Sequence, residues 1–291
     1  MKTFMSKGCI FALVSFVLTV SATYSWAGEK TDRLTRVWET KKQLLVPESV
    51  LFHKKDNTLY VSNINGTPTE KNGKGFISKL SIEGKILKLK WAEGLNAPKG
   101  SVIYKNSFFV SDIDRLVEID MKTGKIRASY PAAGAKFLND VAVDDQGFVY
   151  VTDMDEKNSA IYRLSGKKME IWMKGPEISQ PNGLYMEEKK LMVGNSGDGK
   201  IKAIRLSDKA ITDFATVGSM IDGLRADGKG NYIVSDWTGK TSLVLATGEV
   251  TVLLDTSASK VNSADIEYIP ESHLLLIPTF FDNRVVAYRV R

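Results

Sequence analysis

The sequence is poor in the two residues that bind transition metals most often in proteins. It has one cysteine, Cys9, and two histidines, His53 and His273, among 291 residues. A single cysteine cannot form a disulfide within the chain, so the fold must be stabilised by burial, which a chain of this length can supply. The scarcity of imidazole and thiolate ligands also argues against a zinc site or a redox-metal site.

Long hydrophobic runs are lacking after the first 27 residues. Lys2 and Lys7 precede an apolar stretch over residues 9–20, and Ser25-Trp26-Ala27 has the small-x-small pattern of a cleavage site. We therefore expect residues 1–27 to be a cleaved signal peptide and the mature protein to be periplasmic or secreted. The apolar stretch is short for a membrane span, so no stable membrane insertion is expected after cleavage.

A concentrated basic region is also missing. The formal net charge is +6, but the basic residues are scattered in pairs such as Lys41-Lys42 and Lys189-Lys190. Each pair lies at an expected turn or sheet edge, where solvated lysines discourage aggregation between strands. We expect no nucleic-acid partner, and a small-molecule substrate or ligand instead.

What the sequence does contain is a phrase that returns about every forty residues. Each copy opens on a short apolar stretch and continues through a turn to a closing strand, which ends in Asp or Asn in five copies and in Pro278 in the degenerate sixth. The residue at the opening position of each copy is called its opener. In chain order the openers are Glu48, Lys99, Asn139, Asn182, Asp222 and Ala264. Apolar residues alternate with a period of two inside each copy, and no segment has the period of an amphipathic helix. The sequence predicts an all-β, six-bladed β-propeller, with the openers near one mouth of its central channel.

Residues 28–291 are expected to form this single domain. The sixth copy has only three strands, near residues 265–268, 273–277 and 284–290, whereas a blade has four. Residues 34–45 have strand-like content and no repeat of their own. We expect this N-terminal segment to supply the outer strand of blade six and so to close the ring.

Three other features have an expected role in the fold. The Asp and Asn residues that close the copies are explained by a repeating hydrogen bond within each blade. Trp172 and Trp237 are expected to pack between blades. The first copy is longer than the others because of a polar, Gly-rich loop over residues 65–75, which is either a tolerated surface insertion or a flap over a channel mouth.

Four of the openers carry side-chain oxygens of the kind that hard cations prefer. They are Glu48, Asn139, Asn182 and Asp222. These residues are far apart in sequence and would meet only across the channel. Asn and Asp at strand starts also cap turns, but capping explains a single position better than four equivalent ones. We expect a metal site at these four residues, holding Ca²⁺ or another divalent cation.

Four short phrases resemble the senescence-marker-protein (SMP-30)/gluconolactonase family of calcium-dependent six-bladed propellers, which includes regucalcin-like lactonases. The phrases are Pro47-Glu48, Phe137-Leu138-Asn139-Asp140, residues 180–184 and residues 221–224. The likeness extends through the repeats over nearly the whole mature chain. It implies that Glu48, Asn182 and Asp222 hold the metal and that Asn139 contacts metal-bound water or substrate. It also implies that Asp222 acts as the base.

The resemblance is incomplete on the substrate side. Sugar lactonases of the family place an arginine two residues before the Asn-Asp pair, where this chain has Phe137. The histidine dyad of paraoxonase-type relatives has no counterpart, because neither His53 nor His273 is an opener. We expect Phe137 and Lys99 to lie near the substrate, and the aromatic residue favours a less polar or uncharged substrate.

Two functions are consistent with these residues. The first is a calcium-dependent hydrolase of the gluconolactonase type, with Asp222 and Asn139 as catalytic residues, acting on a lactone or ester in the periplasm. The alternative is a non-catalytic binding propeller similar to the NHL and YWTD scaffolds, in which the metal is structural or absent. The intact set of four oxygen ligands favours the hydrolase, whereas Phe137 favours the scaffold. Fold alone does not decide between them.

Overall fold

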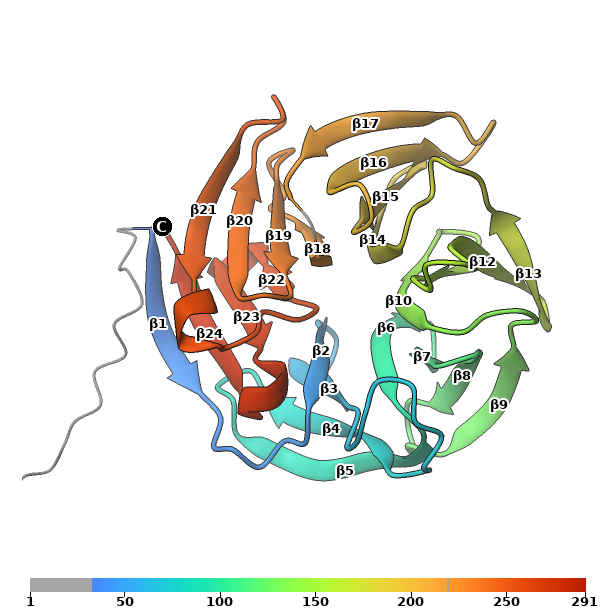
Figure 1. The fold of residues 1–291 in the computed structure, drawn as a ribbon. Helices are drawn as coiled ribbons and strands as arrows, with labels where there is room; N and C mark the ends of the chain where they lie inside the picture. Colours follow the sequence, from blue (N-terminus) through green and yellow to red (C-terminus); the bar gives the residue numbers. More distant parts are fainter. Residues whose placement is uncertain (1–32, 219) are drawn as a thin grey trace, which may run out of the picture.

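The computed structural model describes residues 33–218 and 220–291, and its strands form six four-stranded antiparallel sheets arranged in a ring (Figure 1). The prediction of an all-β, six-bladed propeller is confirmed. The expected signal peptide, residues 1–27, lies outside the described residues. None of the helices found in the described ranges is long and apolar enough to cross a membrane.

The first three blades follow one another along the chain. Blade one consists of β2 (Pro47–His53), β3 (Thr58–Asn63), β4 (Gly75–Ser81) and β5 (Ile86–Leu95). Blade two consists of β6 (Pro98–Tyr104), β7 (Ser107–Asp112), β8 (Arg115–Asp120) and β9 (Ile126–Pro131). Blade three consists of β10 (Leu138–Val143), β11 (Val149–Asp153), β12 (Ala160–Ser165) and β13 (Lys168–Met173).

The next blades repeat this arrangement, and the sixth combines both ends of the described chain. Blade four consists of β14 (Pro181–Glu187), β15 (Lys190–Asn195), β16 (Lys200–Arg205) and β17 (Ile211–Thr216). Blade five consists of β18 (Ile221–Ala226), β19 (Tyr232–Asp236), β20 (Lys240–Val244) and β21 (Val250–Asp255). Blade six consists of β22 (Glu267–Ile269), β23 (Leu274–Pro278), β24 (Val285–Val290) and β1 (Leu34–Glu39).

The N-terminal strand closes the ring as predicted. β1 pairs with β24 in antiparallel register, from Leu34 opposite Val290 to Glu39 opposite Val286. Figure 1 shows the blue strand β1 beside the red strand β24, which belongs to the other end of the chain. The strand is shorter than the predicted segment, because residues 40–46 lead from blade six into blade one. Pairing of β1 satisfies the backbone groups along the outer edge of β24.

Apolar side chains fill the spaces between neighbouring blades. Leu59 and Val61 of blade one pack with Leu274 and Leu276 of blade six in one buried cluster. Trp172 of blade three is buried in one cluster with Leu191 and Val193 of blade four, so its expected packing between blades is confirmed. Burial of these layers holds the blades together.

In blades two and three, the closing Asp accepts hydrogen bonds that position the start of the inner strand. Asp112 accepts from the backbone amides of Asn96 and Ala97, and Asp153 accepts from those of Lys136 and Phe137. The predicted bond within the blade is therefore confirmed in these two blades. Blades four and five differ, since Asn195 donates to the Glu177 carbonyl and Asp236 accepts from Thr238.

In blades two, three and five, the Ser or Thr before the closing residue donates to the next blade. Thr152 Oγ1 donates to the carbonyl of Asn182, at 2.9 Å, and Ser235 Oγ donates to the carbonyl of Ala264, at 2.7 Å. Ser111 donates in the same way to the carbonyl of Asn139. Each of these bonds ties one blade to the opener of the next, so the repeated phrase also sets where the openers lie.

Candidate active site

The inner strands are irregular at the openers. Their pairing registers shift between Pro47 and Ser49, Pro98 and Ser101, Leu138 and Val141, Pro181 and Leu184, and Ile221 and Leu224. Five of the six openers therefore lie within an irregularity of the β-bulge type, which re-aims a side chain and ends regular pairing. Ala264 differs because it precedes β22, which begins at Glu267.

The glycines after two openers are required by close contact between inner strands. A Cβ atom at Gly183 would lie 2.3 Å from the carbonyl oxygen of Asp222, and one at Gly223 would lie 2.4 Å from the backbone nitrogen of Ile266. No larger residue fits at either position without moving the backbone. The Asn-Gly and Asp-Gly phrases therefore bring the openers of neighbouring blades close together.

One cavity of about 180 Å³ is lined by all six residues that the sequence predicts for the site. They are Glu48, Lys99, Phe137, Asn139, Asn182 and Asp222. The convergence across five blades is as predicted. Ala264 does not line the cavity, and neither histidine does. His53 Nδ1 lies 2.7 Å from Asp56, and His273 Nδ1 lies 3.2 Å from the Tyr268 hydroxyl.

Three of the four predicted ligands present side-chain oxygens without partners. Oε2 of Glu48, Oδ1 of Asn139 and Oδ1 of Asn182 are buried and accept no hydrogen bond from any residue that the structure describes. The amide nitrogen of Asn182 donates to Oδ1 of Asp222 at 3.2 Å. Buried oxygens are almost always paired, so three unpaired ones in one cavity indicate a missing cation or donor.

Electrostatics at the two carboxylates lead to the same conclusion. Burial raises the pKa of Glu48 well above its usual range, and the nearby Asp222 raises it further. Burial also raises the pKa of Asp222, with added repulsion from Asp265 and Asp140. Two buried acids that repel each other are poorly stable as anions unless a cation lies between them.

The donor set suits a hard cation. The described residues contain no group of three or more His, Cys, Asp and Glu side chains that could hold a metal ion. The cavity instead offers two carboxylates, Glu48 and Asp222, and two amide oxygens, from Asn139 and Asn182. Carboxylate and amide oxygens are ligands of Ca²⁺, which accepts flexible geometry, whereas zinc and copper prefer nitrogen and sulfur.

Among the described residues that line the cavity, Lys99 is the only cationic one. Its side chain is 1% exposed, and its ammonium group donates to the carbonyls of Pro68 and Ala97, at 2.8 and 3.0 Å. The ammonium nitrogen also lies 4.9 Å from the centroid of the Phe137 ring. Burial lowers the pKa of Lys99 to about 8, although attraction from Glu48 opposes this change.

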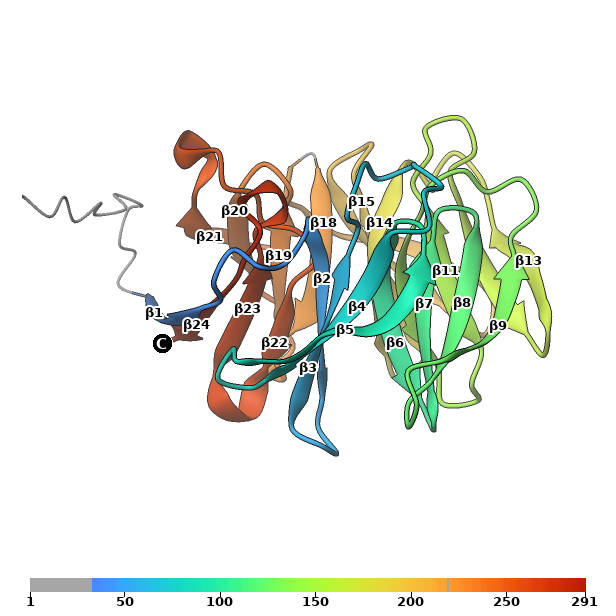
Figure 2. The ribbon, with the colours of Figure 1, turned by 90° about the horizontal axis from the view of Figure 1, so that it is seen from below.

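The loop over residues 65–75 reaches this cavity. Pro68 lines the cavity and accepts the Lys99 hydrogen bond. Farther along the loop, the backbone amide of Gly73 donates to Asn96, and Lys71 pairs with Asp114. In the side view, the segment between β3 and β4 lies on the same side of the ring as the loop leading into β2 (Figure 2). Of the two roles that the sequence left open for this loop, contact with the cavity favours the flap.

The rest of the wall is apolar. It includes Phe137, Met154, Met220, Trp237 and Phe280. The prediction that Trp237 packs between blades is confirmed, because Trp237 follows β19 of blade five and its ring meets Phe280 of blade six edge-on, with 5.5 Å between centroids. The same ring also lines the cavity, which was not predicted. The sequence could not separate the two roles, since an aromatic residue after a closing Asp fits both.

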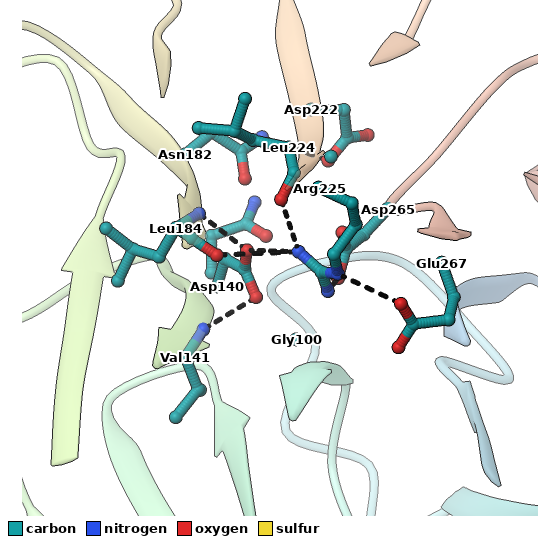
Figure 3. Close-up of polar contacts among 12 residues, drawn as sticks. Gly100, Asp140, Val141, Asn182, Leu184, Asp222, Leu224, Arg225, Asp265 and Glu267 are labelled. Carbon is teal, nitrogen blue, oxygen red and sulfur yellow. Dashed lines mark hydrogen bonds and ion pairs between the residues drawn. The ribbon is translucent and has the colours of Figure 1, made fainter. Parts of the chain in front are cut away.

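A buried ionic network near the openers was not predicted from the sequence. Arg225 on β18 lies 3.7 Å from Asp140, 3.3 Å from Asp265 and 3.7 Å from Glu267. Its Nη1 also donates to the carbonyl of Leu224 at 2.8 Å (Figure 3). Burial raises the pKa of Asp140 to about 7, with repulsion from Asp265, although Arg225 opposes the rise.

This network contacts the strands that carry three of the predicted ligands. Asp140 follows Asn139 directly and accepts from the backbone amide of Leu184 at 2.6 Å (Figure 3). Leu184 is two residues after Asn182, and Arg225 is three residues after Asp222. The available signal was the occurrence of charged residues, Asp140 and Arg225, inside inner strands that are otherwise apolar.

Comparisons with known proteins agree with this arrangement. The family model described as the SMP-30/gluconolactonase/LRE-like region matches residues 46–264. A gluconolactonase from Xanthomonas campestris is 17% identical, with a TM-score of 0.63 over 89% of this chain and 89% of that chain. No curated protein matches the sequence.

Two other solved structures share the fold. Catalytically inactive virginiamycin B lyase from Staphylococcus aureus, solved with quinupristin, is 14% identical, with a TM-score of 0.61 over 89% of this chain and 99% of that chain. A chain of a nidogen–laminin complex is 18% identical, with a TM-score of 0.60 over 71% of this chain and 79% of that chain. These structures share the propeller, whereas the family model matches most of the sequence, including the Asn-Asp, Pro-Asn-Gly and Asp-Gly-Leu phrases. The chain belongs to the SMP-30/gluconolactonase/LRE-like family.

Proposed function

We propose that the protein is a metal-dependent hydrolase of the lactonase type, which cleaves a lactone or ester with an apolar substituent. The observation that supports this proposal most directly is the set of three unpaired buried oxygens, from Glu48, Asn139 and Asn182, in one cavity with Asp222. Glu48, Asn139, Asn182 and Asp222 would hold the ion, and their oxygen donors favour Ca²⁺. Such an ion, when bound, supplies Lewis-acid activation of a carbonyl group.

Proton transfer and substrate binding would be carried out by the protein's own residues. Asp222 is the carboxylate proposed to take up the proton of the attacking nucleophile, because it lies in the cavity beside the other predicted ligands. Asn139 has its amide nitrogen 2.8 Å from the sulfur of Met154, which leaves its oxygen free for the ion or the substrate. Phe137, Trp237 and Phe280 would bind the apolar part of the substrate and exclude water.

Family membership supports the same reaction class, and the Xanthomonas campestris gluconolactonase is a lactonase on this fold. The pattern of residues 1–27 supports action in the periplasm.

The test is metal analysis of the purified protein together with a panel of lactones, aryl esters and phosphotriesters, each assayed with and without chelator. We expect about one divalent ion per chain at the four ligands, and hydrolysis that chelator removes. A calcium-loaded protein that hydrolyses nothing on the panel would instead support the non-catalytic binding propeller.

A further inference from the structure

Lys99 is a buried cation without a carboxylate partner among the described residues. Its ammonium group is held by the carbonyls of Pro68 and Ala97 and by the face of the Phe137 ring. Neutral carbonyls and a ring compensate a buried charge less well than a carboxylate does. A lysine with 1% exposure in the wall of a cavity therefore retains unsatisfied positive charge.

The charges of the residues that line the cavity indicate a role for Lys99 in binding an anion. Only Glu48, Lys99 and Asp222 are charged among the residues that line the cavity. A divalent cation held at the proposed ligands would neutralise the two carboxylates, and the charge of Lys99 would then be left over. The carboxyls around Arg225 do not line the cavity and already contact that guanidinium. With an ion bound, the residues that line the cavity would carry one positive charge in excess, and an anionic ligand beside Lys99 would balance it.

The position of the Lys99 ammonium group changes which substrate Phe137 predicts. The sequence-based reason to expect an uncharged substrate was the aromatic residue where sugar lactonases place an arginine. The structure places the ammonium group of Lys99, from the neighbouring blade, 4.9 Å from the centroid of that ring. The ring and the ammonium group together present an apolar face with a cation at its side.

We propose that Lys99 and Phe137 form a subsite for a carboxylate group of the ligand, whose apolar body packs on Phe137. The inference rests on the proposed function and narrows its substrate to a lactone or ester that carries a carboxylate apart from the carbonyl that reacts. It also gives the 65–75 loop a role, since the Pro68 carbonyl holds the ammonium group in place.

The test compares two probes with the same apolar body, hydrocinnamate and hydrocinnamamide, by calorimetry on the full chain with calcium. Any contact of the probe with the ion is common to wild type and variant, so it cancels when the two proteins are compared. We expect wild type to prefer the acid, and Lys99→Met to reduce that preference about tenfold while binding of the amide is little changed. Lys99→Gln, which keeps a donor for Pro68 but has no charge, should lose the preference equally.

Lys209→Met is the matched control. Lys209 also donates to a backbone carbonyl, that of Trp172 at 2.8 Å, and lies 5.4 Å from the centroid of that ring, but it does not line the cavity. Its loss should leave the preference for the acid unchanged. The proposal is overturned if neither probe binds wild type, or if Lys99→Met and Lys99→Gln keep the preference.

The same experiment separates this proposal from the proposed function. If calcium does not bind and nothing is hydrolysed, yet the preference for the acid still depends on Lys99, the subsite stands and the hydrolase proposal falls. If chelator-sensitive hydrolysis is found and the preference is independent of Lys99, the hydrolase stands and the subsite falls.

Discussion

The amide nitrogen of Asn182 donates to a carboxylate oxygen of Asp222, 3.2 Å away on the inner strand of the next blade. The bond fixes the orientation of the amide, because its nitrogen is engaged and its oxygen is left without a partner in the cavity. Gly183 permits this approach, since a Cβ atom there would lie 2.3 Å from the Asp222 carbonyl oxygen. Two openers forty positions apart in the sequence thus present neighbouring oxygen atoms to the same cavity.

Calcium should stabilise the wild-type protein, and Asp222→Ala should abolish this effect. An ion that binds only the folded state at a hundredfold its Kd adds about 2.7 kcal/mol, which raises Tm by roughly 5 to 10 °C in a domain of this size. Asp222 provides one of two carboxylates in the cavity, so its loss removes half of the negative charge available to the ion. Thermal melting with calcium and with chelator measures the difference.

Asp236→Ala is the control for this prediction. Asp236 belongs to the same blade but accepts from Thr238 and does not line the cavity, so the calcium response should persist in that variant. Equal responses of wild type and Asp222→Ala would mean that the openers are structural caps and that the proposed ligands are wrong.

The stabilisation by calcium should increase with pH. Burial raises the pKa values of Glu48 and Asp222, so in the metal-free protein these groups hold protons that the unfolded chain has already released. The ion must displace those protons, and their displacement costs less as the pH rises. Melting curves at about pH 5 and about pH 8 should therefore show the larger calcium-induced rise in Tm at the higher pH.

The metal-free protein should show the opposite trend. Asp140 has a folded-state pKa of about 7, above its unfolded value near 4, so between these values the folded state binds more protons than the unfolded state. The free energy of unfolding must then fall as the pH rises through this window. Asp140→Asn should flatten the dependence in chelator, and an unchanged slope in that variant would contradict the assignment.

The repeat carried most of the information about the fold. Strand alternation, the period of about forty residues and the missing fourth strand of the last blade were enough to predict six blades closed by β1. The same repeat predicted that Glu48, Asn139, Asn182 and Asp222 would meet, because equivalent positions in a ring lie at the same end of the channel. The structure brings all four to one cavity.

The repeat did not predict which residues of different blades contact each other. A period gives the position of a residue in its blade, but not its partner across the channel. The Arg225 network joins acids from blades three and six, and no spacing in the sequence links them. Likewise, Phe137 was interpreted without the ammonium group above its ring, because Lys99 lies thirty-eight positions earlier in the chain.

Replacement of Arg225 should weaken both the fold and the metal site. Arg225→Met leaves Asp140, Asp265 and Glu267 buried without their common cation, which we expect to cost about 3–5 kcal/mol in the free energy of unfolding. Because Asp140 also accepts from the Leu184 amide, disorder in the network would displace the strands that carry Asn139 and Asn182. Calcium affinity, measured by calorimetry well below Tm, should fall together with stability.

Arg284→Met is the control that separates loss of stability from loss of calcium affinity. Arg284 is also buried and pairs with the carboxylates of Glu39 and Asp282, but neither acid lies on an inner strand that carries a predicted ligand. It should lose comparable stability and keep its calcium affinity. If Arg225→Met binds calcium as tightly as Arg284→Met does, the network only stabilises the fold and has no part in positioning the ligands.

Phe137→Arg should shift substrate preference toward sugar lactones without changing the metal requirement. The wild-type wall offers an aryl or alkyl group the rings of Phe137, Trp237 and Phe280, whereas the hydroxyl groups of a sugar lactone would be buried there with few partners. An arginine at position 137 adds donors for those hydroxyls and removes the apolar face. We expect the ratio of kcat/KM for a sugar lactone to that for an aryl ester to rise about tenfold or more, because unpaired polar groups are penalised strongly.

Phe137→Leu, which replaces the ring with a smaller apolar side chain and adds no donor, should slow aryl ester hydrolysis and leave hydrolysis of the sugar lactone unimproved. Chelator should abolish every activity in all three proteins, since the carbonyl is activated by the ion and not by residue 137. An equal loss on both substrates in Phe137→Arg would show that this residue supports the cavity but does not select its ligand.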